Sequence, residues 1–290
     1  MKNILITGAN SYVGDSVAAY LGRWPEKYRV ETLDMRGEAW KTVDFSPYDA
    51  ILHVAGLVHN AKTRDDPAEL SRYEAVNTHL AVETAKKAKR EGVGQFLFMS
   101  TAGVYGIDGK VGAPVIIDGN TPLNPGNNYG LSKLKAEQGL LPLGEEGFRM
   151  VILRPPMIYG RGCKGNYVTL TKLARKMPVF PRVDNRRSML YIENFAEFVR
   201  LMVENQEQGI FCPQNDEYTN TSRMVAEIAR AHGKKLLLIP GFTWALKLLG
   251  RYTDLAEKAF GNWCYDRSLS DYAQPYCVKT LAQSIAETES

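Results

Sequence analysis

Short apolar runs alternate with amphipathic stretches through the first half of the chain. Runs typical of buried parallel strands cover 2–7, 28–33, 50–54, 95–100 and 149–153. Segments with a helical period lie between them, over 12–24, 80–90 and 131–140. This alternation predicts an α/β fold, a Rossmann-type doubly wound parallel sheet with helices on both faces. In such sheets, ligands bind beyond the carboxyl ends of the strands.

A glycine-containing turn joins the first predicted strand to the first helix. It reads Gly-Ala-Asn-Ser-Tyr-Val-Gly from Gly8 to Gly14, in the order strand, turn and helix that a dinucleotide fingerprint requires. We expect Gly8 to make the tight turn and Gly14 to allow close packing of the helix on the strand. The pyrophosphate would then lie at the helix N-terminus. Ser11 replaces the usual middle glycine, and its hydroxyl can donate a hydrogen bond.

Asp34 ends the second predicted strand, 20 residues beyond Gly14. An acidic side chain at this offset accepts hydrogen bonds from the adenosine ribose and repels a 2′-phosphate, so the sequence favours NAD over NADP. Arg36 lies close enough to reverse that preference. The alternative interpretation of Asp34 is an ordinary turn residue at the end of a strand.

Tyr129 and Lys133 stand four residues apart at the head of the predicted helix 131–140. Residues at this spacing share one helix face. A nearby cation favours the phenolate, so we expect the pKa of Tyr129 to fall well below its usual value of roughly 10. The phenol would then act as a general acid and base on a sugar-like hydroxyl. The alternative is a surface tyrosine and lysine on an ordinary amphipathic helix.

Composition excludes several other classes of protein. With 290 residues, 44% hydrophobic and 23% charged, the chain is typical of soluble globular proteins and long enough for one large core or two lobes. The net charge of +4 includes no long basic run, so neither nucleic acid nor membrane binding is expected. No apolar run approaches the roughly 18 residues that span a bilayer, and no signal peptide is expected before the first strand.

The cysteines and histidines form no metal-ligand pattern, so no metal is expected. Dispersed cysteines indicate reduced thiols and a cytoplasmic location. The cysteines are Cys163, Cys212, Cys264 and Cys277, and we interpret them as packing residues.

Seven segments, in order, resemble the extended short-chain dehydrogenase/reductases and, more narrowly, their nucleotide-sugar epimerase/dehydratase branch. They are Gly8–Gly14, Asp34, His53–Gly56, Asn77, Ser100–Gly106, Tyr129–Lys133 and Arg154–Gly160. The resemblance implies an NAD-binding site, with NADP less favoured, that draws on Gly8, Asn10, Ser11, Tyr12, Val13, Gly14, Asp34, Arg36, Val54, Ala55, Gly56, Asn77, Tyr129 and Lys133. Asn77 is also expected to cap the helix 80–90.

The resemblance further implies a catalytic triad of Thr101, Tyr129 and Lys133. Thr101 would hydrogen-bond the reacting oxygen, Tyr129 would transfer the proton, and Lys133 would lower the tyrosine pKa and bind the nicotinamide ribose. Ser100 is the neighbouring hydroxyl, but consecutive strand residues point to opposite faces, so one of the two should face the site. The alternative for Thr101 is a hydroxyl that satisfies its own turn.

A smaller carboxyl-terminal lobe is expected to hold the substrate. Asn166 would contact the sugar nucleotide, and Arg187, with Arg186 as its competitor, would bind the diphosphate. The predicted division is 1–160 with 188–212 for the NAD-binding domain, and 161–187 with 213–290 for the substrate lobe. The aromatic tail 241–276 could form a lid, a subunit contact or, as we favour for most of it, core packing.

Three functions remain open. The first is an NAD-dependent epimerase at C4 of a UDP-hexose. The second is an NAD(P)H-dependent 4-ketoreductase that makes a deoxysugar nucleotide, and the third is a cofactor-binding protein without chemistry. A 4,6-dehydratase is disfavoured because Ala102 and Gly103 stand where that chemistry places an acidic pair. The family resemblance implies a homodimer, but the base, sugar and reacting carbon stay open.

Overall fold

The chain folds into two compact units. The computed structural model describes residues 1–58, 65–107, 109, 111–242 and 260–290. Unit 1 comprises residues 1–106, 122–155 and 196–213, and unit 2 comprises 107–121, 156–195 and 214–290. These boundaries differ from the predicted division at 107–121, 156–160 and 188–195, which belong to unit 2. The NAD-binding and substrate-binding roles of the two units stay predictions.

Unit 1 contains a six-stranded parallel sheet. Its strands are β1 (Lys2–Thr7), β2 (Tyr28–Leu33), β3 (Ala50–His53), β4 (Gln95–Met99), β6 (Arg149–Leu153) and β10 (Gly209–Phe211). They pair in the order β10-β6-β4-β3-β1-β2. The central strands are apolar on both faces, and Ile4, Ile51 and Leu97 are fully buried, as expected for parallel strands covered on both sides.

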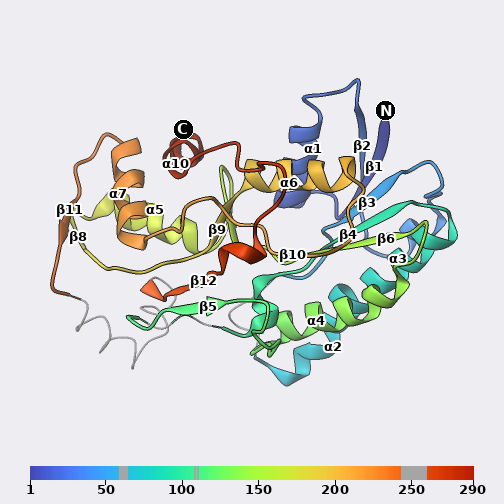
Figure 1. Ribbon diagram of the computed structural model, residues 1–290, viewed down its shortest axis with the longest axis horizontal. Coiled ribbons are helices and arrows are strands. Elements are labelled where there is room, and N and C mark those ends of the chain that lie inside the picture. Colours follow the sequence, from blue (N-terminus) through green and yellow to red (C-terminus); the bar gives the residue numbers. More distant parts are fainter. Residues whose placement is uncertain (59–64, 108, 110, 243–259) are drawn as a thin grey trace. The chain divides into compact units, whose positions relative to one another are not determined.

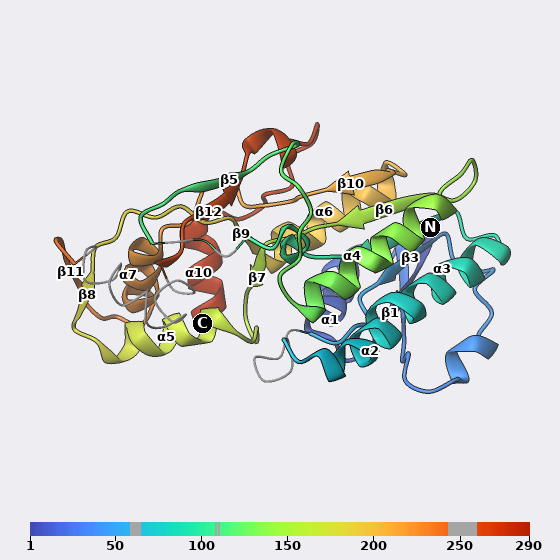
Figure 2. The same ribbon diagram turned by 90° about the horizontal axis from the view of Figure 1, so that it is seen from below.

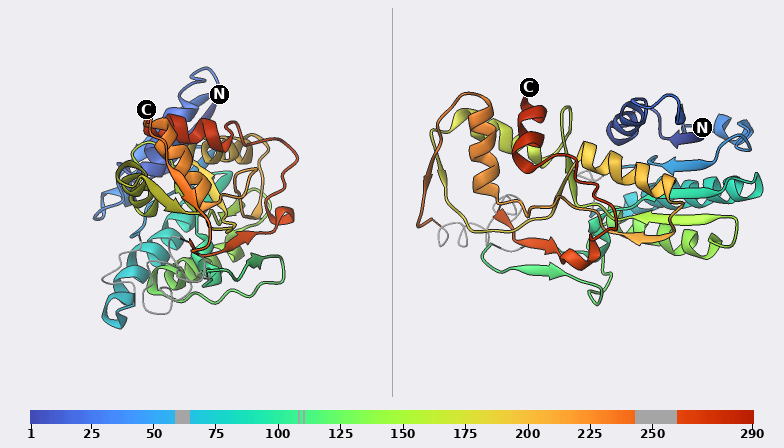
Figure 3. Two further views of the ribbon diagram at one scale, coloured as in Figure 1. Left: turned by 90° about the vertical axis from the view of Figure 1, so that its left-hand side faces the viewer. Right: turned by 45° about the horizontal axis from the view of Figure 1, so that its top comes forward.

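Helices cover both faces of this sheet. In Figure 1, α1 (Tyr12–Leu21) and α6 (Ile192–Glu204) lie on one face, and α3 (Leu80–Arg90) and α4 (Asn128–Leu140) on the other. Figure 2 shows α3 and α4 side by side, and the right-hand view of Figure 3 shows the same layers. The predicted doubly wound fold is confirmed. Strand order reverses between β1 and β3, which is where such sheets bind ligands.

Shorter elements of unit 1 connect these layers. They are η1 (Ala39–Thr42), η2 (Pro67–Glu69), α2 (Leu70–Tyr73), the π-helical segment η3 (Glu74–His79), η4 (Ala102–Tyr105) and η5 (Leu141–Leu143). The first helix ends at Leu21, before the predicted Trp24, and its last residues form i→i+3 turns such as Trp24 N to Leu21 O at 3.0 Å. Pro25 disfavours helical angles at Trp24, so the helix does not extend through the predicted end.

The prediction that Asn77 caps the helix 80–90 is wrong. Segments α2, η3 and α3 run continuously, and Asn77 lies inside the π-helical segment. Its fully buried side chain bonds elsewhere: Oδ1 accepts from Leu57 N at 2.7 Å, and Nδ2 donates to Leu57 O at 3.1 Å and Ser132 Oγ at 3.0 Å. A π-bulge is a frequent device for turning a side chain toward a functional site.

The described residues of unit 2 form short strands paired in parallel, with helices packed beside them. The pairs are β5 (Val115–Ile117) with β12 (Trp263–Tyr265), β7 (Met157–Tyr159) with β9 (Met189–Tyr191), and β8 (Val179–Pro181) with β11 (Leu237–Ile239). The helices are α5 (Asn166–Lys176), α7 (Thr221–Ala231) and α10 (Leu281–Glu289), with a short η6 (Arg267–Leu269). Buried Tyr159 lies at the centre of several contacts in this core. Its ring stacks on that of Tyr167, with the ring centroids 5.3 Å apart, and its hydroxyl is hydrogen-bonded to Ser284 Oγ at 2.6 Å.

The described part of the aromatic tail packs mainly in the core of unit 2. Tyr265 is fully buried and Phe260 is 8% exposed, whereas Phe242 is 46% exposed. Trp244 and Tyr252 lie outside the described residues. No helix among the described segments is both long enough and apolar enough to cross a membrane.

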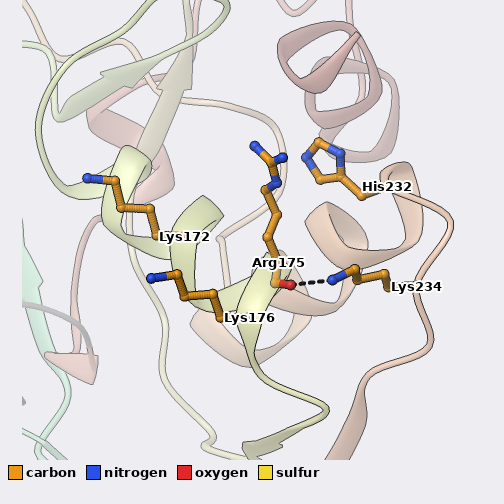
Figure 4. A pocket seen from close by; sticks show the side chains of 5 residues that line it. All are labelled: Lys172, Arg175, Lys176, His232 and Lys234. Carbon is orange, nitrogen blue, oxygen red and sulfur yellow. Dashed lines mark hydrogen bonds between the residues drawn. The ribbon is translucent and has the colours of Figure 1, made fainter.

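A basic hollow of about 430 Å³ lies at the end of α5 (Figure 4). It is lined by Lys172, Arg175, Lys176, His232 and Lys234. Lys234 Nζ donates to the carbonyl of Arg175, and His232 Nε2 lies 2.7 Å from Glu289 Oε2. Cations are stabilised at the carboxyl end of a helix, where the last carbonyls carry negative partial charge. The hollow therefore has a structural explanation, and none of the predicted site residues lines it.

Candidate active site

The glycine turn occupies the carboxyl end of β1, beside the end of β3. Gly8 has φ +107° and Asn10 has φ +63°, both in the left-handed region. A Cβ added to Gly8 would lie 2.7 Å from Ala55 N, so a side chain at this position would strike the neighbouring backbone. Ser11 caps α1, because its Oγ accepts from Gly14 N at 3.1 Å. The turn thus leaves the N-terminal end of α1, including Tyr12 and Val13, arranged as an anion site.

Gly8→Ala is expected to lower both the melting temperature and the affinity for NAD. A strained backbone conformation costs on the order of 1–3 kcal/mol, and the added methyl must also displace Ala55. Gly37→Ala is the matched control, since Gly37 has φ +70° but no atom within 4 Å of an added Cβ. Thermal unfolding with and without NAD measures both effects. Equal results for the two variants would show that the close approach to Ala55 has no role.

Asp34 and Arg36 form a close ion pair immediately after β2. The Arg36 Nε lies 3.0 Å and 2.9 Å from the two carboxylate oxygens, and its Nη2 lies 2.5 Å from Oδ2. The hydrogen bonds from the Arg36 side chain lower the pKa of Asp34 to about 2. Gly8 N donates to Leu33 O at 2.8 Å, which holds this strand end against the glycine turn. An incoming ribose would have to compete with the Arg36 guanidinium for hydrogen bonds to the Asp34 carboxylate.

The end of β3 contributes a backbone wall. Val54 N and Ala55 N both donate to Thr7 O, at 3.0 Å and 2.9 Å. A Cβ added to the exposed Gly56 would lie 2.9 Å from Asn77 Oδ1 and 3.2 Å from Lys133 Nζ. Gly56 therefore lies against both side chains with no room for one of its own.

Helix α4 brings Tyr129 and Lys133 to the end of β4. Asn127 caps the helix by accepting from Gly130 N at 2.9 Å, so Tyr129 lies in the first turn and Lys133 one turn later. A Cβ on Gly130 would lie 2.6 Å from Gly103 O, which explains how η4 and α4 pack so closely. Lys133 is 3% exposed, and its Nζ donates to Met99 O at 2.8 Å.

The expected lowering of the Tyr129 pKa is wrong for this structure. Burial raises the pKa of the phenol to about 12, against a smaller lowering by the neighbouring Thr101 hydroxyl. Burial also lowers the pKa of Lys133 to about 7, while Glu137 acts in the opposite direction. The physical reason is that desolvation disfavours both the tyrosine phenolate and the lysine ammonium. In addition, Lys133 Nζ donates its hydrogen bond to the Met99 carbonyl.

Thr101 and Ser100 face different environments, as expected from strand alternation. Thr101 caps η4, because its hydroxyl oxygen accepts from Gly103 N at 3.0 Å. The Thr101 hydroxyl also hydrogen-bonds the phenol of Tyr129, which lowers the pKa of that phenol by less than burial raises it. Ser100 is buried, and its Oγ donates to Glu137 Oε1. The structure thus brings Thr101, Tyr129 and Lys133 together in unit 1, with Thr101 as the hydroxyl on the Tyr129 side.

Sequence reasoning missed a buried ion pair beneath these residues. Glu137, on α4, is bound by Arg154, which follows β6: Nη2 lies 2.6 Å from Oε2. The two side chains are 1% and 7% exposed. A signal was present, because Glu137 stands one helical turn after Lys133 and Arg154 opens one of the family-like segments.

The predicted substrate residues Asn166 and Arg187 belong to unit 2. Asn166 is the first residue of α5 and is exposed. The backbone N–H of Arg187 donates to Thr219 O at 2.9 Å, and the N–H of Thr219 donates to Arg187 O at 2.8 Å. Burial lowers the pKa of the Arg187 guanidinium to about 10. The binding of a diphosphate by Arg187 stays a prediction. Arg186 is exposed, and its backbone N–H donates to Asn262 Oδ1 at 3.0 Å.

Comparison with known proteins identifies the family. Residues 4–212 match the model of the NAD dependent epimerase/dehydratase family. The chain belongs to this family. It is an enzyme of the extended short-chain dehydrogenase/reductase class, of the NAD(P)-dependent sugar-nucleotide epimerase or reductase type.

Relatives and solved structures support the assignment to the NAD dependent epimerase/dehydratase family. A UDP-glucose 4-epimerase of Vibrio cholerae is 29% identical, over 92% of this chain and 88% of the relative. An N-acetyl-α-D-glucosaminyl-diphospho-ditrans,octacis-undecaprenol 4-epimerase of Escherichia coli O157:H7 is 26% identical, over 89% and 81%. In fold, the chain resembles a dTDP-4-dehydrorhamnose reductase from Bacillus anthracis in complex with NADP. The TM-score is 0.71 at 18% identity, covering 99% of this chain and 98% of that one.

The residues of unit 1 fit the nicotinamide dinucleotide that the family name implies. The turn at Gly8 has no space for a side chain, and α1 offers an N-terminal anion site. Asp34 supplies a ribose acceptor at the end of β2, and the exposed Gly56 lies against Asn77 and Lys133 without a side chain of its own. The geometry does not distinguish NAD from NADP, because Asp34 favours the first and Arg36 can favour the second.

Proposed function

We propose that this chain is an NAD-dependent nucleotide-sugar epimerase that acts at C4 of a UDP-hexose. The observation that carries the proposal is the Thr101, Tyr129 and Lys133 set, assembled at the end of β4 in the unit that holds the glycine turn. The likeness to a UDP-glucose 4-epimerase over 92% of the chain supports the choice of substrate and carbon. Asp34 supports NAD.

A bound NAD would supply the hydride acceptor for oxidation at C4 and the hydride donor for reduction of the 4-keto sugar. Tyr129 removes the proton from the C4 hydroxyl and later returns a proton to the C4 oxygen. Thr101 donates a hydrogen bond to that oxygen and stabilises the charge that develops there. Charged Lys133 favours the phenolate and donates to the nicotinamide ribose, which requires its Nζ to leave the Met99 carbonyl. Asn166 and Arg187 are proposed to bind the sugar nucleotide.

A 4-ketoreductase is the second candidate, and one observation favours it. With its pKa raised to about 12, Tyr129 is protonated near neutral pH. This is the form that donates a proton during ketone reduction, whereas sugar oxidation needs the phenolate. The NADP complex of the reductase of similar fold supports the same alternative. The third candidate, a cofactor-binding protein without chemistry, is disfavoured by the assembled triad. We expect a homodimer in each case, formed through α3 and α4.

Release of the cofactor from the purified protein tests the proposal. The protein is denatured, and the released nucleotide is identified and quantified by mass spectrometry. About one NAD⁺ per chain supports the epimerase, since a cofactor that is regenerated in each turnover has no need to leave. A panel of UDP-hexoses then identifies the substrate. An empty protein that reduces 4-keto sugar nucleotides with NADH or NADPH would contradict the epimerase.

Asp34→Ala is expected to shift the cofactor preference toward NADP. The change removes the charge that repels a 2′-phosphate and frees Arg36 to bind it. A hydrogen bond to a charged group contributes about 1.5–3 kcal/mol, so the ratio of the NADP and NAD dissociation constants should fall at least about 10-fold. Arg36→Ala is the control, and it should keep the preference for NAD. An unchanged ratio in Asp34→Ala would assign the choice to another group.

A further inference from the structure

Helix α4 is attached to the end of β4 through two side chains one turn apart. Lys133 Nζ donates to Met99 O at 2.8 Å, and Glu137 accepts from the hydroxyl of the next residue, Ser100. Residues four apart on a helix share one face. Because these two bonds reach successive residues of the strand, they fix the register between the helix and the strand end.

Glu137 is the centre of a buried network that joins four elements of unit 1. Arg154 Nε lies 3.1 Å and 3.2 Å from the two carboxylate oxygens, and its Nη2 lies 2.6 Å from Oε2. Arg154 Nη1 also donates to Tyr105 Oη, in η4, at 3.0 Å. Glu137, Ser100, Arg154 and Tyr105 are all buried. A carboxylate so deeply buried is stable only with such partners.

The network touches each segment that carries a proposed catalytic group. Ser100 directly precedes Thr101, and Glu137 lies on the helix of Tyr129 and Lys133. From these contacts we infer that Glu137 is a positioning residue that holds Tyr129 and Lys133 in register with Thr101 and supplies a negative charge that favours the ammonium of Lys133. The inference deepens the proposed function and rests on it for the catalytic role of Lys133.

The charge effect follows from what surrounds Lys133. Burial lowers the pKa of Lys133 to about 7, and Glu137 raises it. On β3, His53 is neutral, because burial lowers its pKa to about 3. The centroid of the Phe98 ring, in β4, lies 4.6 Å from Lys133 Nζ. Asn77, in the π-helical segment, and Lys133 both lie against Gly56. Neutralising Glu137 would remove the negative charge that favours the ammonium of Lys133, so that ammonium would become harder to maintain.

Titration of Lys133 in Glu137→Gln tests the inference. The midpoint is followed by NMR of protein labelled with [¹³Cε]lysine, and Lys133→Arg assigns the resonance. An opposite charge within about 4–6 Å shifts a pKa by about one unit or more, so the midpoint in Glu137→Gln should fall by about one pH unit or more. The pH profile of kcat should move in the same direction, with little change in sugar KM. An unchanged midpoint would overturn the inference.

The variant Ser100→Ala distinguishes the positioning role of Glu137 from the effect of its charge on Lys133. It removes one hydrogen bond to Glu137 and keeps both charges, so kcat should fall while the Lys133 midpoint stays. A midpoint that falls equally in Ser100→Ala would show that general loosening, and not the Glu137 charge, controls Lys133, and would contradict the inference.

A second variant covers the case in which Glu137→Gln does not fold. The double variant Glu137→Gln/Arg154→Met removes both charges, and replacing a buried pair in this way is often tolerated. Because the double variant also lacks the Glu137 carboxylate that raises the pKa of Lys133, the midpoint should still fall. The NMR midpoint needs no turnover. If the wild-type protein turned over no sugar nucleotide and the midpoint still moved, the proposed function would fail while the Glu137–Lys133 coupling would stand.

Discussion

Tyr129→Phe is expected to lower kcat by about 10²–10⁴-fold, the range that general acid–base catalysis contributes. Phenylalanine keeps the ring and loses the hydroxyl that takes and returns the proton. Cofactor binding should change little, because the glycine turn, Asp34 and Gly56 are untouched. Turnover of the best UDP-hexose and the NAD dissociation constant are the two measurements.

Tyr73→Phe is the matched control for this experiment. Tyr73 is buried on α2 and lies near enough to affect the pKa of Tyr129. Its hydroxyl donates to Val58 O at 3.4 Å and has no proposed part in the chemistry. This variant should retain most of the activity. Similar losses in both variants would indicate disturbed packing, and full activity of Tyr129→Phe would remove Tyr129 from the mechanism.

Arg154→Met is expected to destabilise the protein by about 3–5 kcal/mol, the usual result of removing one partner of a buried ion pair. The variant leaves the carboxylate of Glu137 buried without a counter-charge, and Ser100 still donates a hydrogen bond to it. The free energy of unfolding, measured with urea and followed by circular dichroism, reports the loss.

The double variant Glu137→Gln/Arg154→Met provides the comparison for Arg154→Met. With both charges gone, no charge remains buried without its partner, so stability should recover most of the loss. This cycle depends only on the fold and needs no substrate. A double variant at least as unstable as Arg154→Met would contradict the assignment of Glu137 and Arg154 as a coupled pair.

The first five strands of the unit 1 sheet and helices α1, α3 and α4 were predictable because their patterns are local, whereas β10 and α6 were not predicted. Runs 2–7, 28–33 and 149–153 match β1, β2 and β6, and the strands predicted at 50–54 and 95–100 each end one residue earlier in the structure. Buried parallel strands leave a continuous apolar signal. Unit 2 gave no comparable signal, because each of its strands has only three residues.

The features that escaped prediction depend on contacts between distant segments. Asn77 reads as a helix cap, yet its side chain bonds Leu57 and Ser132, 20 and 55 residues away. Tyr129 and Lys133 read as a charged pair, but the burial that controls both pKa values comes from the folded surroundings. The partner of Glu137 was likewise hidden, because Arg154 follows a different strand. Spacing therefore located the catalytic candidates, and only the packing showed their charge states.

The fate of the C4 hydrogen tests the proposed epimerase most directly. UDP-glucose that carries deuterium at C4 is incubated with the protein and NAD, and the sugar nucleotides and the cofactor are analysed by mass spectrometry. The account predicts UDP-galactose that retains the deuterium at C4, with no accumulation of reduced cofactor, because the hydride returns to the same carbon. Absence of the C4 epimer, or deuterium that accumulates in released NADH, would contradict it.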